Sequence, residues 1–262
     1  MSIILADYEP QREAFTELLQ PECRKHILMF RGQSGRGKTT LLNACLEDLP
    51  PGIHHVPIQL RGNAVSVAEV FYRSGDRLEW DRFPNFTEQV ATLSSAPDVQ
   101  INRNWLAGIN NQISIALRAE NPTDREERRA ALTHAWFKDI QELDRLLLMS
   151  LDTYEQATTD VKDWISGPFL ARATRCKQMR VLLAGREIPD PHNIEWGECC
   201  ASHDLYGVLE AEHWLPVVQA LGRRIPIEPA LTWLAGVCHA RSGRPDEIMT
   251  IIEALPRQEI VA

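Results

Sequence analysis

The stretch that most constrains the fold of this chain is 32–39, which reads GQSGRGKT. It fits the pattern G-x-x-x-x-G-K-[ST] of a phosphate-binding loop. The apolar run 27–30 before it indicates a buried strand, and 40–46 behind it carries apolar residues at helical spacing. In a strand, glycine-rich turn and helix, backbone N–H groups converge on an anion and the helix dipole adds partial positive charge. The sequence therefore predicts an α/β protein with a phosphate site after its first strand.

The residue types in this loop suit nucleoside phosphates. Gly35 and Gly37 permit backbone conformations that a Cβ would block. Lys38 supplies a positive charge for the β- and γ-phosphates, and the Thr39 hydroxyl can ligate Mg²⁺. The candidate nucleotide-binding residues of the loop are Gly32, Gln33, Ser34, Gly35, Arg36, Gly37, Lys38, Thr39 and Thr40.

A second landmark is the apolar stretch 146–151, which ends in Asp152 and is followed by Glu155. An aspartate at the end of a strand beside a phosphate loop holds the Mg²⁺ hydration shell, so Asp152 and Thr39 are the candidate metal residues. A second carboxylate can orient or deprotonate the attacking water, which makes Glu155 a candidate catalytic residue. A helix-capping role explains Glu155 equally well.

A third landmark is the buried stretch 179–185, which ends next to Arg186. An arginine at the carboxyl end of a parallel strand faces the same crevice as the phosphate loop. Arg186 is therefore a candidate for contacting a γ-phosphate, and the alternative is a surface arginine in a loop.

The rest of the chain suggests two parts. The strand expected at 54–60 contains Pro57, which belongs near a strand end or at a sheet edge. Residues 98–120 are expected to form a β-hairpin insertion, with the alternating stretch 112–118 as one strand and 101–108 as its partner. A fifth strand is expected near 198–203, and only helices follow. We expect a nucleotide-binding domain over 1–206 and a helical subdomain over 207–262.

Composition limits the function classes. The net charge of −8 argues against a broad nucleic-acid-binding face. No apolar run approaches the roughly 20 residues that span a bilayer, and Asp7 and Glu9 lie where a signal peptide would be basic or apolar. The six cysteines include no C-x-x-C pair. These features predict a cytoplasmic protein without a membrane partner, and they give no indication of a nucleic-acid partner, although a local basic patch is compatible with the net charge.

The ordered motifs resemble the STAND class of P-loop ATPases, which includes NACHT and NB-ARC proteins and is related to AAA+ ATPases. The resemblance rests on the loop at 32–39, on Asp152 with Glu155, and on the strand that ends at Arg186. Arg12-Glu13 resembles the Arg-Glu element of the class, and Gly243-Arg244-Pro245 resembles its G-x-P motif, whose proline abuts the nucleotide. The resemblance covers about 5–255, while 98–120 lies outside the common core.

The resemblance implies a three-layer αβα sandwich with a five-stranded, mostly parallel sheet in the order 5-1-4-3-2, followed by a small helical subdomain. It implies ATP or ADP with Mg²⁺ as ligands, Arg12 and Pro245 as nucleotide contacts, and slow ATP hydrolysis. ADP would hold the two parts closed, and ATP would open them and permit self-association. STAND proteins usually carry further domains, so effector or sensor domains or partner proteins are also implied.

Three alternatives remain open from the sequence. A constitutive AAA+-like ATPase module would turn over rapidly with an arginine finger from a neighbouring subunit, and Arg172, Arg175 and Arg180 are available for that role. A small-molecule or nucleotide kinase would need an acceptor site and a lid. A nucleotide-binding scaffold that no longer hydrolyses would differ in the role of Glu155.

Overall fold

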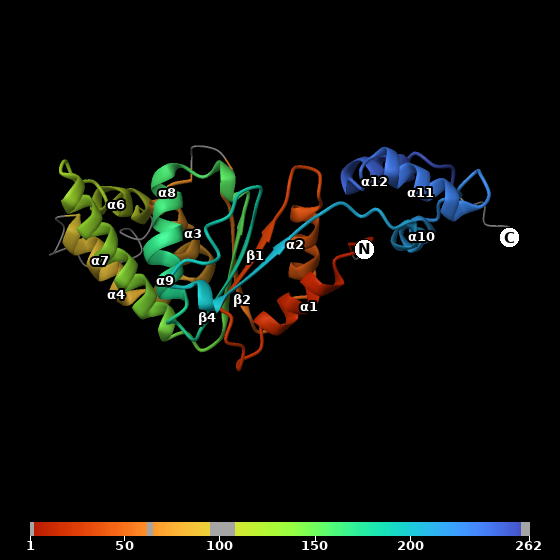
Figure 1. Ribbon diagram of the computed structural model, residues 1–262. Helices are drawn as coiled ribbons and strands as arrows, with labels where there is room; N and C mark the ends of the chain where they lie inside the picture. The colour runs from red at the N-terminus through yellow and green to blue at the C-terminus, as the bar shows by residue number, and fades with distance from the viewer. Residues whose placement is uncertain (1–2, 62–64, 95–107, 258–262) are drawn as a thin grey trace.

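A five-stranded parallel sheet forms the centre of the protein (Figure 1). The structure, a computed structural model, describes residues 3–61, 65–94 and 108–257. The strand order is β2-β3-β4-β1-β5, and every neighbouring pair is parallel. The predicted five-stranded sheet, in the order 5-1-4-3-2, is confirmed. The strands are β1 (Ile27–Arg31), β2 (His54–Gln59), β3 (Leu147–Asp152), β4 (Met179–Gly185) and β5 (Cys200–Asp204).

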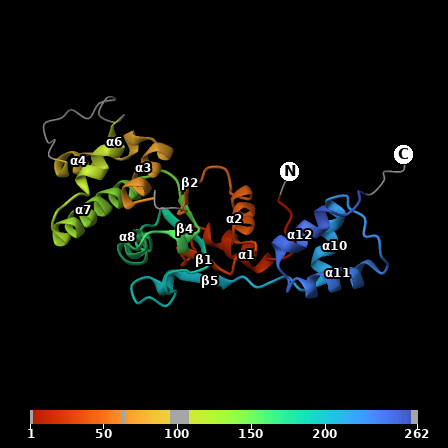
Figure 2. The ribbon, with the colours of Figure 1, turned by 90° about the horizontal axis from the view of Figure 1, so that it is seen from above.

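Helices cover both faces of the sheet, as Figure 2 shows from above. On one face lie α1 (Glu9–Leu18) and α2 (Lys38–Glu47). The helices of the other side are α3 (Val67–Leu78), α4 (Pro84–Leu93), α6 (Ile109–Ala116), α7 (Pro122–Gln141), α8 (Thr159–Trp164) and α9 (Leu170–Ala173). The result is the three-layer arrangement that the resemblance implied.

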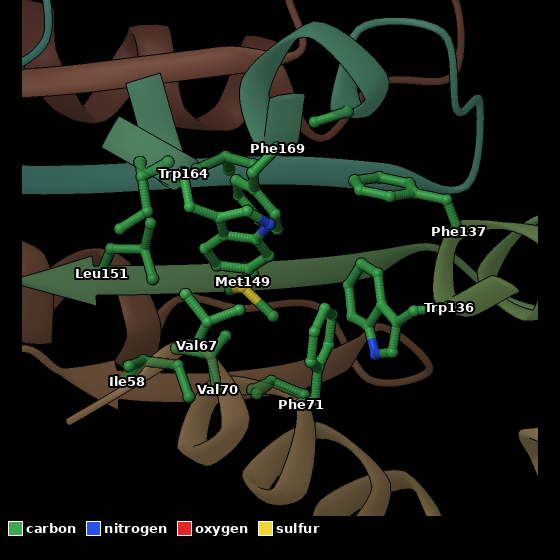
Figure 3. Close-up of a cluster of buried hydrophobic side chains, with 14 of the residues drawn as sticks. Ile58, Val67, Val70, Phe71, Trp136, Phe137, Met149, Leu151, Trp164 and Phe169 are labelled. Atoms are coloured by element: carbon green, nitrogen blue, oxygen red, sulfur yellow. The ribbon is translucent and has the colours of Figure 1, made fainter. Parts of the chain in front are cut away.

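Alternation along the strands sends side chains into two separate cores. In β1, Ile27 and Met29 face the α3–α9 side, whereas Leu28 and Phe30 face α1 and α2. Both sets are almost completely buried, because a parallel sheet is covered on both faces. Figure 3 shows the first core, where aromatic residues from α3, α7 and α8 pack over β3. The rings of Trp164 and Phe169 lie 4.8 Å apart, centre to centre.

Pro57 lies in β2, which is the edge strand next to β3. The residue is exposed, and the edge position removes the need for a second ladder partner at its missing N–H. The expected edge placement of this strand is therefore confirmed.

The β-hairpin expected within 98–120 is wrong for the part that the structure describes. The stretch expected as a strand, 112–118, overlaps helix α6, which is followed by a turn. Ile109, Ile113 and Ala116 recur at helical spacing and are fully buried against α3 and α4. The alternation that suggested a strand came from Ile115, which is only half-buried. The expected partner strand at 101–108 lies, except for Gly108, outside the described residues.

A helical tail, which we define as 207–257, follows β5. It contains α10 (Ala211–Ala220), α11 (Ala230–Ala240) and α12 (Pro245–Glu253). Gly243 has a φ of +63°, as expected for a residue that ends one helix, and Pro245 occupies the first turn of the next. The tail lies beyond α2 and shares a buried cluster with it through Leu205 and Val208 (Figure 1). Among the helices that the structure describes, none has the length and apolar character needed to cross a bilayer.

Candidate nucleotide-binding site

The phosphate loop lies at the carboxyl edge of the sheet, between β1 and α2. Gly35 and Gly37 have φ values of +80° and +78°, which only glycine adopts at little cost. Gly37 is the N-cap of α2, so the first N–H groups of that helix point out of its end. Gly32 N donates to Gly185 O at 3.2 Å and ties the start of the loop to β4. The loop therefore has the conformation that its glycines predicted.

A cavity of about 620 Å³ opens beside this loop. Its volume lies in the range of pockets that hold small molecules and cofactors. Of the nine expected loop residues, Ser34, Gly35, Gly37, Lys38, Thr39 and Thr40 line it. Gly32, Gln33 and Arg36 do not line the cavity, and each instead supports the loop from outside.

Lys38 reaches along the loop. Its Nζ donates to Gln33 O at 3.0 Å, which holds the ammonium group against the phosphate loop. Burial lowers the pKa of Lys38, while the nearby carboxylates of Glu155 and Asp152 oppose that shift. A bound phosphate would add further negative charge and favour the ammonium form.

Thr39 and Asp152 meet, although 113 positions separate them in the sequence. Thr39 Oγ1 donates to Asp152 Oδ2 at 3.1 Å, and Thr153 N donates to the other carboxylate oxygen at 2.8 Å. The residue after Asp152 has a φ of +63°, which turns the chain sharply at the end of β3. A hydroxyl and a carboxylate side by side are hard oxygen donors, so the pair fits Mg²⁺.

Glu155 and Arg186 form a closed pair in the same cavity. Arg186 donates from its backbone N at 2.8 Å and from Nε at 3.0 Å to the two carboxylate oxygens of Glu155. Burial tends to raise the pKa of Glu155, but these hydrogen bonds and the positive charge outweigh it and lower the pKa. A Cβ at Gly185 would lie 3.1 Å from Glu155 and collide with Glu187 O. Glycine at position 185 therefore allows the Glu155 carboxylate to lie close to the end of β4.

The helical tail contacts the phosphate loop. Arg36 Nη1 donates to Ser242 O at 2.8 Å, and Asp246 N lies 3.4 Å from Gly35 O. Pro245 lines the cavity, as expected, together with Asp246. The start of α12 therefore faces the loop that would hold the phosphates.

The structure places Arg12 elsewhere. Its Nη2 lies 2.6 Å from Asp48 Oδ2, at the carboxyl end of α2 and about 15 Å along that helix from the phosphate loop. Arg12 does not line the cavity, so the expectation that it contacts the nucleotide is wrong. The start of α1 supplies Tyr8 instead, whose hydroxyl donates to Arg36 O at 2.7 Å. Burial raises the pKa of Tyr8 to about 12, so this donor keeps its proton at neutral pH.

Several cavity residues carry no sequence pattern that could have singled them out. One wall is apolar and combines segments from both ends of the chain. Arg61, which follows β2, adds a cation, and Asp246 adds a carboxylate. The apolar lining consists of Ile4, Leu5, Ala6, Val208, Trp214 and Met249.

Comparisons with known proteins give structural likeness only. No protein-family profile matches the sequence, and no curated protein is significantly similar to it. Among solved structures, the Walker-type ATPase of Pyrococcus abyssi aligns over 95% of this chain and 71% of its own, at 14% identity and a TM-score of 0.48. Cdc6p from Pyrobaculum aerophilum aligns over 96% of this chain and 61% of its own, with the same identity and TM-score. The functional conclusion therefore rests on the cavity.

Proposed function

We propose that the protein binds ATP and ADP with Mg²⁺ and acts as a switch whose helical tail responds to the nucleotide. The observation that carries this proposal is the direct contact between tail and phosphate loop, Arg36 to Ser242 and Asp246 to Gly35. A ligand in the cavity would touch both parts of the chain. Its phosphates can then change how the two parts are held together.

The phosphates would lie in the loop, against Lys38 and the N–H groups at the start of α2. The apolar wall, which includes Leu5, Trp214 and Met249, would receive the base. We propose ATP rather than GTP for two reasons. The motifs resemble those of ATPases, and the sequence contains no N-K-x-D guanine signature.

Thr39 and Asp152 would hold the Mg²⁺, because their oxygens already lie 3.1 Å apart at the end of the loop. Bound there, the ion would neutralise charge on the β- and γ-phosphates. Asp152 keeps its orientation through the hydrogen bond from Thr153 N. Asp152 would be held by the end of β3 and Thr39 by the first turn of α2 before any ligand enters.

Hydrolysis would be slow because Glu155 is already engaged. A base must accept the proton of water while the water oxygen bonds to the γ-phosphorus and the bond to the bridging oxygen breaks, which releases ADP and phosphate. Both oxygens of Glu155 accept hydrogen bonds from Arg186. A γ-phosphate that attracts the Arg186 guanidinium would free one of them.

The two nucleotides would favour different arrangements of the tail. ADP fits the closed contacts between Gly35 and α12. The γ-phosphate adds negative charge to a cavity where Asp246 lies against the loop, which favours opening and self-association. The energy available is limited to the difference in nucleotide affinity between the two arrangements.

Isothermal titration tests whether the cavity binds nucleotide. We expect Mg²⁺-ATP and Mg²⁺-ADP to bind the wild type, and Lys38→Ala to weaken both by about tenfold or more, since a charge-assisted phosphate contact is lost. Lys25→Ala is the control, because Lys25 bonds to carbonyl groups near β5 and does not line the cavity. Undiminished ATP binding by Lys38→Ala would refute the proposed site.

A further inference from the structure

We infer that Arg61 contacts the terminal phosphate of a bound nucleoside triphosphate and makes the cavity select triphosphate over diphosphate. The inference rests on the proposed function, because it needs a nucleotide in the cavity. It concerns a residue that no motif in the sequence singles out.

The sheet places Arg61 next to the metal-binding end of β3. Gln59 pairs with Asp152 in the β2–β3 ladder, and Leu60 N donates to Asp152 O at 2.9 Å. Arg61 follows directly, at the carboxyl edge of the sheet, and lines the same cavity as Lys38 and Glu155. Its backbone is therefore anchored while its long side chain projects from the end of an ordered strand.

The strand order decides which phosphate Arg61 can reach. The phosphate loop follows β1, and β4 and β3 lie between β1 and β2. Three strand spacings of about 4.8 Å separate the two strand ends by about 14 Å. The α- and β-phosphates are held at the loop, so only the terminal phosphate extends across β4 and β3 toward Arg61.

The charges in the cavity leave Arg61 available for this contact. Three cationic side chains line the cavity, and three carboxylates balance them: Lys38, Arg61 and Arg186, with Asp152, Glu155 and Asp246. Arg186 is paired with Glu155, whereas no ion pair or side-chain hydrogen bond involves Arg61 within the described part of the chain. The residue lines the cavity and is exposed to solvent.

A guanidinium suits this position better than an ammonium. It presents several N–H donors in a plane and binds two phosphate oxygens at once. Contact with the terminal phosphate also stabilises the charge that develops there during hydrolysis. Arg61 would then strengthen triphosphate binding and raise turnover, while contributing little to diphosphate binding.

The test is to titrate Arg61→Ala and Arg61→Lys with Mg²⁺-ADP and with a non-hydrolysable Mg²⁺-ATP analogue. We expect Arg61→Ala to weaken binding of the analogue about tenfold and to change ADP affinity less than twofold, with Arg61→Lys in between. Arg145→Ala is the matched control, because Arg145 is exposed just before β3, at the opposite edge of the sheet. Thermal denaturation without nucleotide confirms that each variant folds.

The possible outcomes distinguish a failure of the Arg61 inference from a failure of the proposed function. If the wild type binds both ligands and Arg61→Ala keeps the wild-type ratio of the two affinities, the inference is overturned and the proposed function stands. An equal loss for ADP and analogue also overturns it, since a general electrostatic effect would explain the loss. If the wild type binds neither ligand, the proposed function fails and the inference fails with it.

Discussion

The carboxylate of Asp152 joins the sheet to the phosphate loop. It is 8% exposed and accepts hydrogen bonds from Thr39 Oγ1 and Thr153 N. A buried carboxylate is retained only when its oxygens have partners, and Mg²⁺ would become a further partner on the cavity side. Asp152 is therefore the residue at which a metal requirement can be tested separately from the loop itself.

We expect Asp152→Asn to remove the dependence of ATP binding on Mg²⁺. In the wild type, a chelator should weaken ATP binding about tenfold, whereas in Asp152→Asn the affinities with and without chelator should be nearly equal. Titration calorimetry measures both. Asp163→Asn, at an exposed position of α8, should behave as the wild type. A full chelator effect in Asp152→Asn would show that Mg²⁺ is held elsewhere.

The predicted site residues that line the cavity are mostly those whose chemistry fixes both type and spacing. Lys38 and Thr39 belong to one contiguous loop, and Asp152 ends a recognisable strand. Arg12 was placed by a weak two-residue match, and its actual partner, Asp48, depends on how α1 packs on α2. Tyr8 could not be predicted, because its role depends on a φ of +85° and on a tertiary contact.

At the scale of elements, α4 begins with N–H groups that another helix satisfies. Asp139 of α7 is 1% exposed and accepts hydrogen bonds from Asn85 N at 3.1 Å and Phe86 N at 2.8 Å. The side chain of Asn85 donates a third bond, at 2.6 Å. Asp139 thus caps α4 from outside and joins α4 to α7.

Replacing Asp139 by Ala should lower the free energy of unfolding by about 3 kcal/mol, since the buried N–H of Phe86 and the partly buried N–H of Asn85 lose a charged acceptor. Urea denaturation measures the change. Glu127→Ala, at an exposed position on the same helix, should change the free energy of unfolding by no more than about 0.5 kcal/mol. A loss below about 1 kcal/mol for Asp139→Ala would mean that water caps α4 instead.

The elements show where sequence patterns suffice and where they do not. The three central strands, β1, β3 and β4, were predictable because they are buried on both faces and therefore read as continuous apolar runs. Helix α6 was not, because an eight-residue segment with apolar residues at 109, 113 and 115 fits both periods. Its packing against α3 and α4 decided the outcome, and those contacts lie far away in the sequence.

At the scale of the whole molecule, the tail and the phosphate loop are held together by close backbone approaches. Arg36 passes over Gly207 to reach Ser242 O. A Cβ at Gly207 would collide with Arg36 Nη1 and lie 2.5 Å from Ser242 O. The sequence predicted a helical tail near the nucleotide from Pro245, but it could not show that the tail contacts the loop itself.

Gly207 does not itself line the cavity, so the closed arrangement can be disrupted without replacing a cavity residue. Gly207→Ala should break the contact between Arg36 and Ser242, because the added Cβ would occupy the space through which Arg36 Nη1 reaches Ser242 O. The backbone oxygens of Ser242 and Gly243 cannot rotate away from it, so the Arg36 side chain must leave. Gly236→Ala, in α11, is the matched control, since nothing lies within 4 Å of its added Cβ. Alanine in that helix should leave the tail in place and slightly stabilise it.

Hydrogen exchange of the segments 205–210 and 242–249 tests the switch most directly. With Mg²⁺-ADP, we expect slow exchange in both segments of the wild type and of Gly236→Ala. With the non-hydrolysable ATP analogue, exchange should become faster, and in Gly207→Ala it should be fast with either nucleotide. Equal exchange of the wild type with ADP and with the analogue, both bound at saturation, would contradict a nucleotide-controlled tail.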